Sequence, residues 1–125
     1  MVSLVDSSVW ITFFAGEASS LDQLLEEGEA CLSEIILMEL QPFLHIHRDQ
    51  KIIDLLETVK RVPMRVDWAE LRMIRIEILQ NGINKVGIPD LIILQQALQN
   101  NLPICSFDKQ FKLMKEIFDF ELIEG

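Results

Sequence analysis

Four acidic residues stand where a short apolar segment meets a helix-like pattern. In MVSLVDSSVWI an apolar run stops at an aspartate, GIPDLII and ICSFDKQF repeat this arrangement, and ILMELQ sets a glutamate among apolar residues. These residues, called the four acids below, are Asp6, Glu39, Asp90 and Asp108. If they converge, their carboxylates repel one another, and a divalent cation removes that conflict. Oxygen ligands without a histidine or cysteine set suit Mg²⁺ or Mn²⁺, so the pattern predicts metal-assisted phosphodiester hydrolysis.

Each acid taken alone also has a purely structural interpretation. Asp6 and Asp108 could each cap the helix that follows. Asp90 comes one residue after Pro89 and could interact with the helix dipole in the first turn. Glu39 could face solvent, although an apolar helix seldom holds an unpaired carboxylate. The catalytic interpretation therefore depends on the combination of the four acids.

Short apolar runs alternate with longer stretches of helical period, which is typical of an α/β domain. Strands are predicted at about residues 2–5, 29–33, 61–66, 103–107 and 120–123, and helices at about 7–16, 19–28, 34–44, 48–60, 67–81, 89–100 and 108–117. Such crossovers favour a mostly parallel sheet of about five strands, covered by helices on both faces. Sites in these sheets form beyond the carboxyl ends of the strands, so we expect the four acids at one edge.

Size and charge restrict the class of protein. The 125 residues suit one domain over residues 1–125. No apolar run reaches the ~18 residues of a membrane span and the start lacks a basic signal region, so we expect a cytoplasmic protein. Cys31 and Cys105 are predicted to be buried strand thiols. A net charge of −9 argues against broad binding of nucleic acid through lysine and arginine, but a metal can bring phosphates to an acidic site and a basic protein can be a partner.

At this point the chain resembles a known family. The segments LVDSSVWI, SEIILMEL, GIPDLIILQQAL and CSFDKQF, in this order, are similar to the motifs of the PIN domain, and most similar to those of single-domain VapC-type toxins of prokaryotic toxin–antitoxin pairs. The resemblance covers essentially the whole chain. It implies an α/β/α sandwich, a Mg²⁺- or Mn²⁺-dependent endoribonuclease acting on RNA, frequent homodimers and a tightly bound antitoxin protein.

The resemblance also assigns roles to individual residues. The four acids match the family's acidic positions and would hold the metal, with Glu39 binding it directly or through water. Ser7 matches the small hydroxyl after the first acid, and Ser106 matches the hydroxyl two residues before the last. In the family the latter hydroxyl lies near the metal site and bonds the carboxylates. One departure is LQPFLHIHRDQ, which stands near a family turn that often contains glycine, so the end of that helix stays open.

Basic and aromatic residues carry weaker predictions. Arg72, Arg75 and Lys85 could contact RNA phosphates, or the two arginines could form the solvated face of helix 67–81. The same two interpretations hold for a lysine row at helical spacing beside Asp108, namely Lys109, Lys112 and Lys115. Two tryptophans, Trp10 and Trp68, are predicted to be packing residues.

Other functions compete with ribonuclease activity. One alternative is a non-catalytic PIN-like module that binds metal or a protein partner. Another is a phospho-acceptor receiver domain, but Asp6 is followed by serines rather than acids, and the lysine expected after the last strand is not evident. Half of the residues are hydrophobic, which predicts a homodimer through the apolar faces of helices 34–44 and 48–60.

Overall fold

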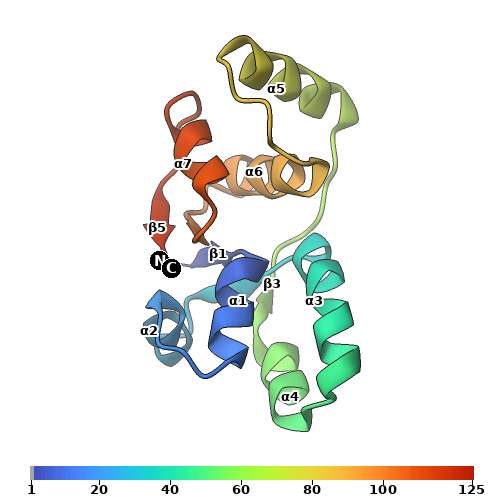
Figure 1. Cartoon of the computed structure of the whole chain (residues 1–125), viewed down its shortest axis with the longest axis vertical. Helices are drawn as coiled ribbons and strands as arrows, with labels where there is room; N and C mark the ends of the chain where they lie inside the picture. The colour runs from blue at the N-terminus through green and yellow to red at the C-terminus, as the bar shows by residue number, and fades with distance from the viewer. Residues whose placement is uncertain (1) are drawn as a thin grey trace.

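A five-stranded parallel sheet forms the centre of the protein (Figure 1). The computed structural model describes residues 2–125. The strands, in the order β3-β2-β1-β4-β5, are joined by parallel ladders throughout. Their bounds are β1 (Ser3–Val5), β2 (Ala30–Leu32), β3 (Lys60–Arg61), β4 (Ile104–Ser106) and β5 (Leu122–Glu124). The predicted α/β class with about five parallel strands is thus confirmed.

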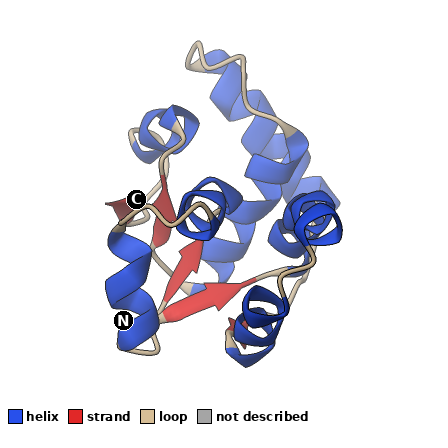
Figure 2. Cartoon of the chain, turned by 60° about the horizontal axis from the view of Figure 1, so that its bottom comes forward, coloured by secondary structure: helices blue, strands red, loops and turns tan. Residues whose placement is uncertain are grey.

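Seven helices in the described residues surround this sheet, and Figure 2 shows them on both sides of the strands. They are α1 (Ser7–Phe14), α2 (Ser20–Glu26), α3 (Glu34–His47), α4 (Gln50–Thr58), α5 (Trp68–Gln80), α6 (Ile88–Asn100) and α7 (Lys109–Lys115). Helix α1 packs against α2, α3 and β4, whereas α6 packs against α3 and α5. None of the helices within residues 2–125 has the length and apolar character needed to cross a bilayer.

The central strands are buried on both faces. All three residues of β1, β2 and β4 are buried, as expected for strands under two helical layers. Cys31 and Cys105 are free and buried in β2 and β4, as predicted. Burial raises the pKa of Cys31 to about 12 and that of Cys105 to about 11, so both thiols stay protonated and unreactive at neutral pH.

Two element boundaries differ from the sequence prediction. Helix α3 continues through Pro42 to His47 and ends where Arg48 adopts a left-handed conformation (φ 47°). Pro42 is exposed, so the carbonyl group that loses its amide partner can be hydrated. Strand β3 has only two residues, Lys60 and Arg61, instead of the predicted 61–66. Pro63 has no N–H to donate to a ladder, and the chain leaves the sheet there.

Helix α5 stands away from the sheet on two connecting segments, residues 62–67 and 81–87 (Figure 1). The fully buried Gln95 of α6 anchors its start. The Gln95 Nε2 group donates to the Asp67 carbonyl oxygen (2.9 Å) and to Glu70 Oε1 (2.8 Å), and its Oε1 accepts from the Asp67 amide (3.2 Å). Asp67 caps α5 by accepting from the Glu70 amide, while the Glu70 carboxylate bonds Gln95. Gly82, at φ +81°, follows the helix.

Trp10 connects α1 to the sheet. Its side chain is fully buried in the hydrophobic cluster, as predicted, and its Nε1–H donates to the Val5 carbonyl oxygen at 3.1 Å. Because Val5 directly precedes Asp6, this contact fixes the turn from β1 into α1. Trp68 differs from its prediction as a packing residue, because 58% of its surface is exposed.

Candidate active site

The four acids lie where parallel strands end and helices begin. Asp6 follows β1, Asp108 follows β4 after one intervening residue, and Asp90 is the third residue of α6. Glu39 lies on α3, which follows β2. Parallel strands bring these points to one edge, and helix N-termini there carry partial positive charge that favours anions.

Asp6 is buried and fully engaged on one side of its carboxylate. Only 5% of the residue is exposed. Its Oδ2 accepts two short hydrogen bonds, from Ser106 Oγ at 2.8 Å and from Ser8 Oγ at 2.9 Å. Asp6 occupies the N-cap position of α1, yet its side chain makes no capping bond to the helix. The helix-cap interpretation therefore does not account for this residue, and its Oδ1 atom stays available to a ligand.

The two serines on Asp6 also hold the loop that carries Asp108. Ser106 Oγ accepts from the Asp108 amide at 2.9 Å, and Ser8 Oγ accepts from the Phe107 amide at 3.3 Å. Each hydroxyl thus donates its hydrogen to Asp6 and accepts from backbone N–H groups. These hydrogen bonds connect the end of β1 to the loop after β4, beyond the ladder that pairs the two strands.

Ser7 lies between the first acid and the acid on α3. Its Oγ atom is 3.5 Å from Asp6 Oδ1 and 3.5 Å from Glu39 Oε1, so it can donate a weak hydrogen bond to one carboxylate at a time. Glu39 as a residue is exposed. Its carboxylate nevertheless stands at the rim of the acidic region, where Ser7 connects it to Asp6.

Asp108 and Asp90 each make one local bond to their own helix. Asp108 Oδ1 accepts from the Gln110 amide at 2.9 Å, so the capping interpretation holds for this residue. A backbone hydrogen bond from Gly87, the N-cap of α6, reaches Asp90. A carboxylate has two oxygens and about four lone pairs, so one capping bond leaves room for a further ligand. Capping and metal binding are thus compatible at both positions.

Mutual repulsion is visible in the protonation behaviour of two acids. Partial burial, then the charges of Asp108 and Asp6, raise the pKa of Asp90 from 3.8 to about 6. The pKa of Glu39 is also raised, first by desolvation and then by Asp6 and Asp90, while the Ser7 hydrogen bond opposes the shift. The charges of the other three acids raise the pKa of Glu39, and the charges of Asp6 and Asp108 raise that of Asp90. Burial and like charge thus act together on Asp90 and Glu39.

The comparison with protein families decides the assignment. The profile of the PIN domain matches residues 3–117, which includes all four acids. The chain belongs to the PIN-domain family. No curated protein sequence matches it significantly.

Solved structures share the fold of this PIN domain. They include VapBC2 from Rickettsia felis bound to a DNA fragment from their promoter, at 20% identity and a TM-score of 0.77, covering 100% of this chain and 99% of that chain. DNA-bound VapBC from Salmonella typhimurium has 17% identity and a TM-score of 0.73, covering 99% and 98%. VapBC-5 from Mycobacterium tuberculosis has 23% identity and a TM-score of 0.69, also covering 99% and 98%. At these identities the likeness shows the fold.

Metal binding at the edge of this PIN domain has a suitable donor set but no preformed cage. Within residues 2–125, no group of three or more histidine, cysteine, aspartate or glutamate side chains is arranged to hold an ion. The donors at the four acids are carboxylate oxygens with nearby hydroxyls, the hard ligands that Mg²⁺ and Mn²⁺ prefer. Like charges oppose closer approach when no cation neutralises them. The donor chemistry therefore fits a divalent cation.

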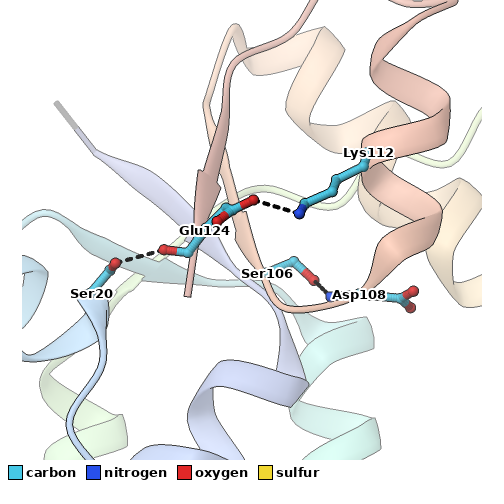
Figure 3. A network of polar contacts seen from close by, with 5 residues as sticks. All are labelled: Ser20, Ser106, Asp108, Lys112 and Glu124. Atoms are coloured by element: carbon cyan, nitrogen blue, oxygen red, sulfur yellow. Dashed lines mark hydrogen bonds and ion pairs between the residues drawn. The ribbon is translucent and has the colours of Figure 1, made fainter.

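A hydrogen bond and an ion pair hold strand β5 in place beside this site (Figure 3). The Glu124 carbonyl oxygen accepts from Ser20 Oγ at 2.6 Å, and its carboxylate pairs with Lys112 Nζ at 2.5 Å. Lys112 lowers the pKa of Glu124 through this hydrogen bond and its charge. The middle lysine of the predicted basic row on α7 is thus already paired.

Sequence reasoning found Ser7 and Ser106 but missed Ser8. Ser106 bonds Asp6 as expected of the hydroxyl before the last acid, and Ser7 contacts Asp6 and Glu39. Ser8 makes a shorter bond to Asp6 than Ser7 does, and it also reaches Phe107. Only the doubled serine in DSS could have suggested it, because its second contact lies 99 residues away.

Proposed function

We propose that this PIN domain is a metal-dependent endoribonuclease that hydrolyses RNA phosphodiester bonds, as the toxin of a VapBC-type toxin–antitoxin pair. The observation that carries the proposal is the hydrogen-bonded cluster at one sheet edge, in which Ser106 joins Asp6 to the Asp108 amide and Ser7 lies between Asp6 and Glu39. A purely structural set of caps would not need hydroxyl groups that join one acid to the segment carrying the next. PIN domains that resemble VapC toxins are typically ribonucleases, which agrees with this chemistry.

In the proposed site, Mg²⁺ or Mn²⁺ would be held by Asp6, Asp90 and Asp108, with Glu39 direct or through water. The bound ion supplies a water of lowered pKa and neutralises charge on the scissile phosphate. Ser8 and Ser106 hold Asp6 through its Oδ2 atom, which leaves Oδ1 beside Ser7 and able to bind the ion. Ser7 orients Glu39. The N-terminal ends of α1, α6 and α7 add positive potential where the phosphate would lie.

Sequencing of RNA ends after induced expression tests the function directly. The wild type is expected to create new RNA ends at defined positions, and Asp90→Asn is expected to create none. If neither protein produces new ends, the non-catalytic alternative, a module that binds metal or a protein, replaces this proposal.

Mn²⁺ is expected to bind the four acids and to stabilise the fold. A ligand that binds only the folded state stabilises it by about 2.7 kcal/mol at a concentration of about 100 times Kd. Protons compete with the ion at Asp90, so affinity should fall as the pH drops below about 6. Titration calorimetry and thermal melts at pH 7.5 and 5.0 measure both effects. The absence of heat and of any melting shift at pH 7.5 would contradict the metal assignment.

A cognate antitoxin is the proposed protein partner. The acidic site calls for a basic side chain that replaces the cation, so the antitoxin would direct an arginine or lysine toward the four acids. The resulting ion pairs would be partly shielded from solvent and less sensitive to salt than exposed pairs. A small reading frame beside this gene that encodes such a protein would support the pairing, and both partners would meet RNA in the cytoplasm.

Self-association through α3 and α4 is expected as well. Met38 and Ile46 of α3 are each 74% exposed, which leaves large apolar side chains in water. Light scattering at micromolar concentration is expected to give the mass of a homodimer, and Met38→Glu with Ile46→Glu is expected to give a monomer. A wild-type protein that stays monomeric throughout the concentration series would count against this interface.

A further inference from the structure

Three arginines gather around the exposed Trp68. Arg48 donates to the His45 carbonyl oxygen and Arg61 pairs with Glu34. The remaining arginines, Arg65, Arg72 and Arg75, are exposed and make no hydrogen bond or ion pair with the described part of the chain. On a protein of net charge −9, three unpaired guanidinium groups beside one tryptophan form a local exception to the overall charge.

These side chains line two neighbouring cavities that share Trp68. The larger, of about 600 Å³, lies between residues 63–68 and the end of α6, and Arg65 and Gln99 line it. The smaller, of about 110 Å³, is formed by Trp68, Leu71, Arg72 and Arg75 of α5 with Ile88 and Leu91 of α6. Neither cavity is lined by any of the four acids. Trp68 thus separates two openings, each bordered by at least one arginine.

The smaller cavity is lined in part by the first turn of α6, the helix that carries Asp90. Ile88 and Leu91 lie in the first turn of α6, on either side of Asp90 in the sequence. Ile88 is 53% exposed, so this apolar surface continues to the start of the helix. A chain of nucleotides that lies along α5 would therefore arrive at the helix end that carries one of the four acids.

We infer that Trp68, Arg65, Arg72 and Arg75 form a track that binds single-stranded RNA and guides it toward the four acids, an inference that rests on the proposed ribonuclease function. An exposed tryptophan face stacks on any base, and unpaired arginines bind successive phosphates. Gln99 adds an amide that can bond a base edge. Asp67 also lines the larger cavity, but its carboxylate caps α5. The grouping of cations around an aromatic ring favours RNA over an apolar protein partner.

Binding of a fluorescein-labelled single-stranded RNA of mixed sequence to the Asp90→Asn protein in chelator tests the track without catalysis. Trp68→Ala is expected to weaken binding about 5- to 150-fold, the effect of one lost stacking contact. Removing Arg72 and Arg75 together is expected to reduce the slope of log affinity against log salt by about 0.7 per residue. The matched control is Lys51→Ala on α4, at the opposite end of the molecule in Figure 1, which should change affinity little.

Tryptophan emission gives a second readout. Trp10 is buried and Trp68 is exposed, so stacked RNA should quench emission from Trp68 alone. The quenching should disappear in Trp68→Phe while binding partly persists, because a phenyl ring still stacks. Circular dichroism melts confirm that each variant is folded.

Several outcomes would overturn the track. These are no RNA binding, equal affinity of Trp68→Ala and its Asp90→Asn parent, or a wild-type dimer that Trp68→Ala dissociates, which would make this face a contact between copies.

Failure of the ribonuclease proposal would give a different set of results. If wild type with Mn²⁺ cuts no RNA, but RNA binding depends on Trp68, then the track stands and the catalytic proposal fails. If the wild type cuts RNA and the Trp68 and arginine variants keep its affinity and KM, the catalytic proposal stands and the track fails.

Discussion

Asp90→Asn is expected to abolish RNA cleavage while the protein stays folded. The substitution keeps the shape of the side chain and removes the charge that would hold the cation. Even residues that only support metal ligands change activity about 10- to 100-fold, so a ligand should cost more than about 100-fold. Cleavage of total RNA with Mn²⁺ measures this loss. Asp6→Asn is expected to behave alike, because Asp6 is the acid bonded by two serines.

Stability in chelator distinguishes a ligand from a structural residue. The raised pKa of Asp90 means that the folded protein holds its proton more tightly than the unfolded chain does. The ionised carboxylate therefore destabilises the fold, from no effect below about pH 4 to the full effect above about pH 6. After allowance for solvent screening of this partly exposed group we expect about 1 kcal/mol, or a melting temperature about 3–5 °C higher for Asp90→Asn at pH 7.5.

The difference between the two proteins should shrink as the pH is lowered from 7.5 toward 4, because protonation relieves the same strain in the wild type. A structural partner of the helix dipole predicts the opposite sign, a loss of about 0.3–1 kcal/mol in the variant. If Asp90→Asn melts lower in chelator and still cuts RNA at the wild-type rate, Asp90 is only that partner.

Trp10→Ala is expected to reduce the free energy of unfolding by about 3–5 kcal/mol. The ring is fully buried, and its loss leaves a cavity and an unpaired Val5 carbonyl group. Total stabilities of about 5–15 kcal/mol make this a large fraction. Urea denaturation measures this loss of unfolding free energy, provided that the m-value of the variant equals that of the wild type. Trp10→Phe should lose less, and Trp68→Ala at the exposed position should stay within about 0.5 kcal/mol of wild type. Equal midpoints for Trp10→Ala and wild type would disprove the anchoring role.

The elements that position the site could be predicted because their signals are local. Apolar runs placed β1 and β4, and acids directly after them marked the strand ends. Ser19 forms the full capping box that begins α2, and Asp67 caps the start of α5. The positions of the four acids near the sheet edge could be expected because parallel strands and the helices that follow them meet at one edge, which is a property of the α/β fold class.

Other features depend on partners that no local pattern reveals. The role of Ser8 requires Phe107, which lies 99 residues later in the chain. Trp68 was predicted to pack because tryptophan is usually buried, but Gln95 fixes the start of α5 so that the ring faces water. Strand β3 was overestimated because its alternating residues resemble a strand, whereas Pro63 interrupts any ladder. The C-terminal end of helix α3 was also difficult to predict, because Pro42 usually marks the end of a helix but here lies inside it.

The sheet order also determines when the proposed enzyme can become active during its own synthesis. β1 is made first, yet it pairs on one side with β4, and Leu4 aligns with Ile104. The hydrogen bond from Ser106 to Asp6 can form only after Ser106 has been synthesised, 100 residues later. Pairing across such a long loop is slow and must wait for the distant strand. A nascent chain on the ribosome therefore carries three of the four acids without an assembled site. A toxin of this design would not cut the RNA of its own translation machinery until the last quarter of the protein has left the exit tunnel.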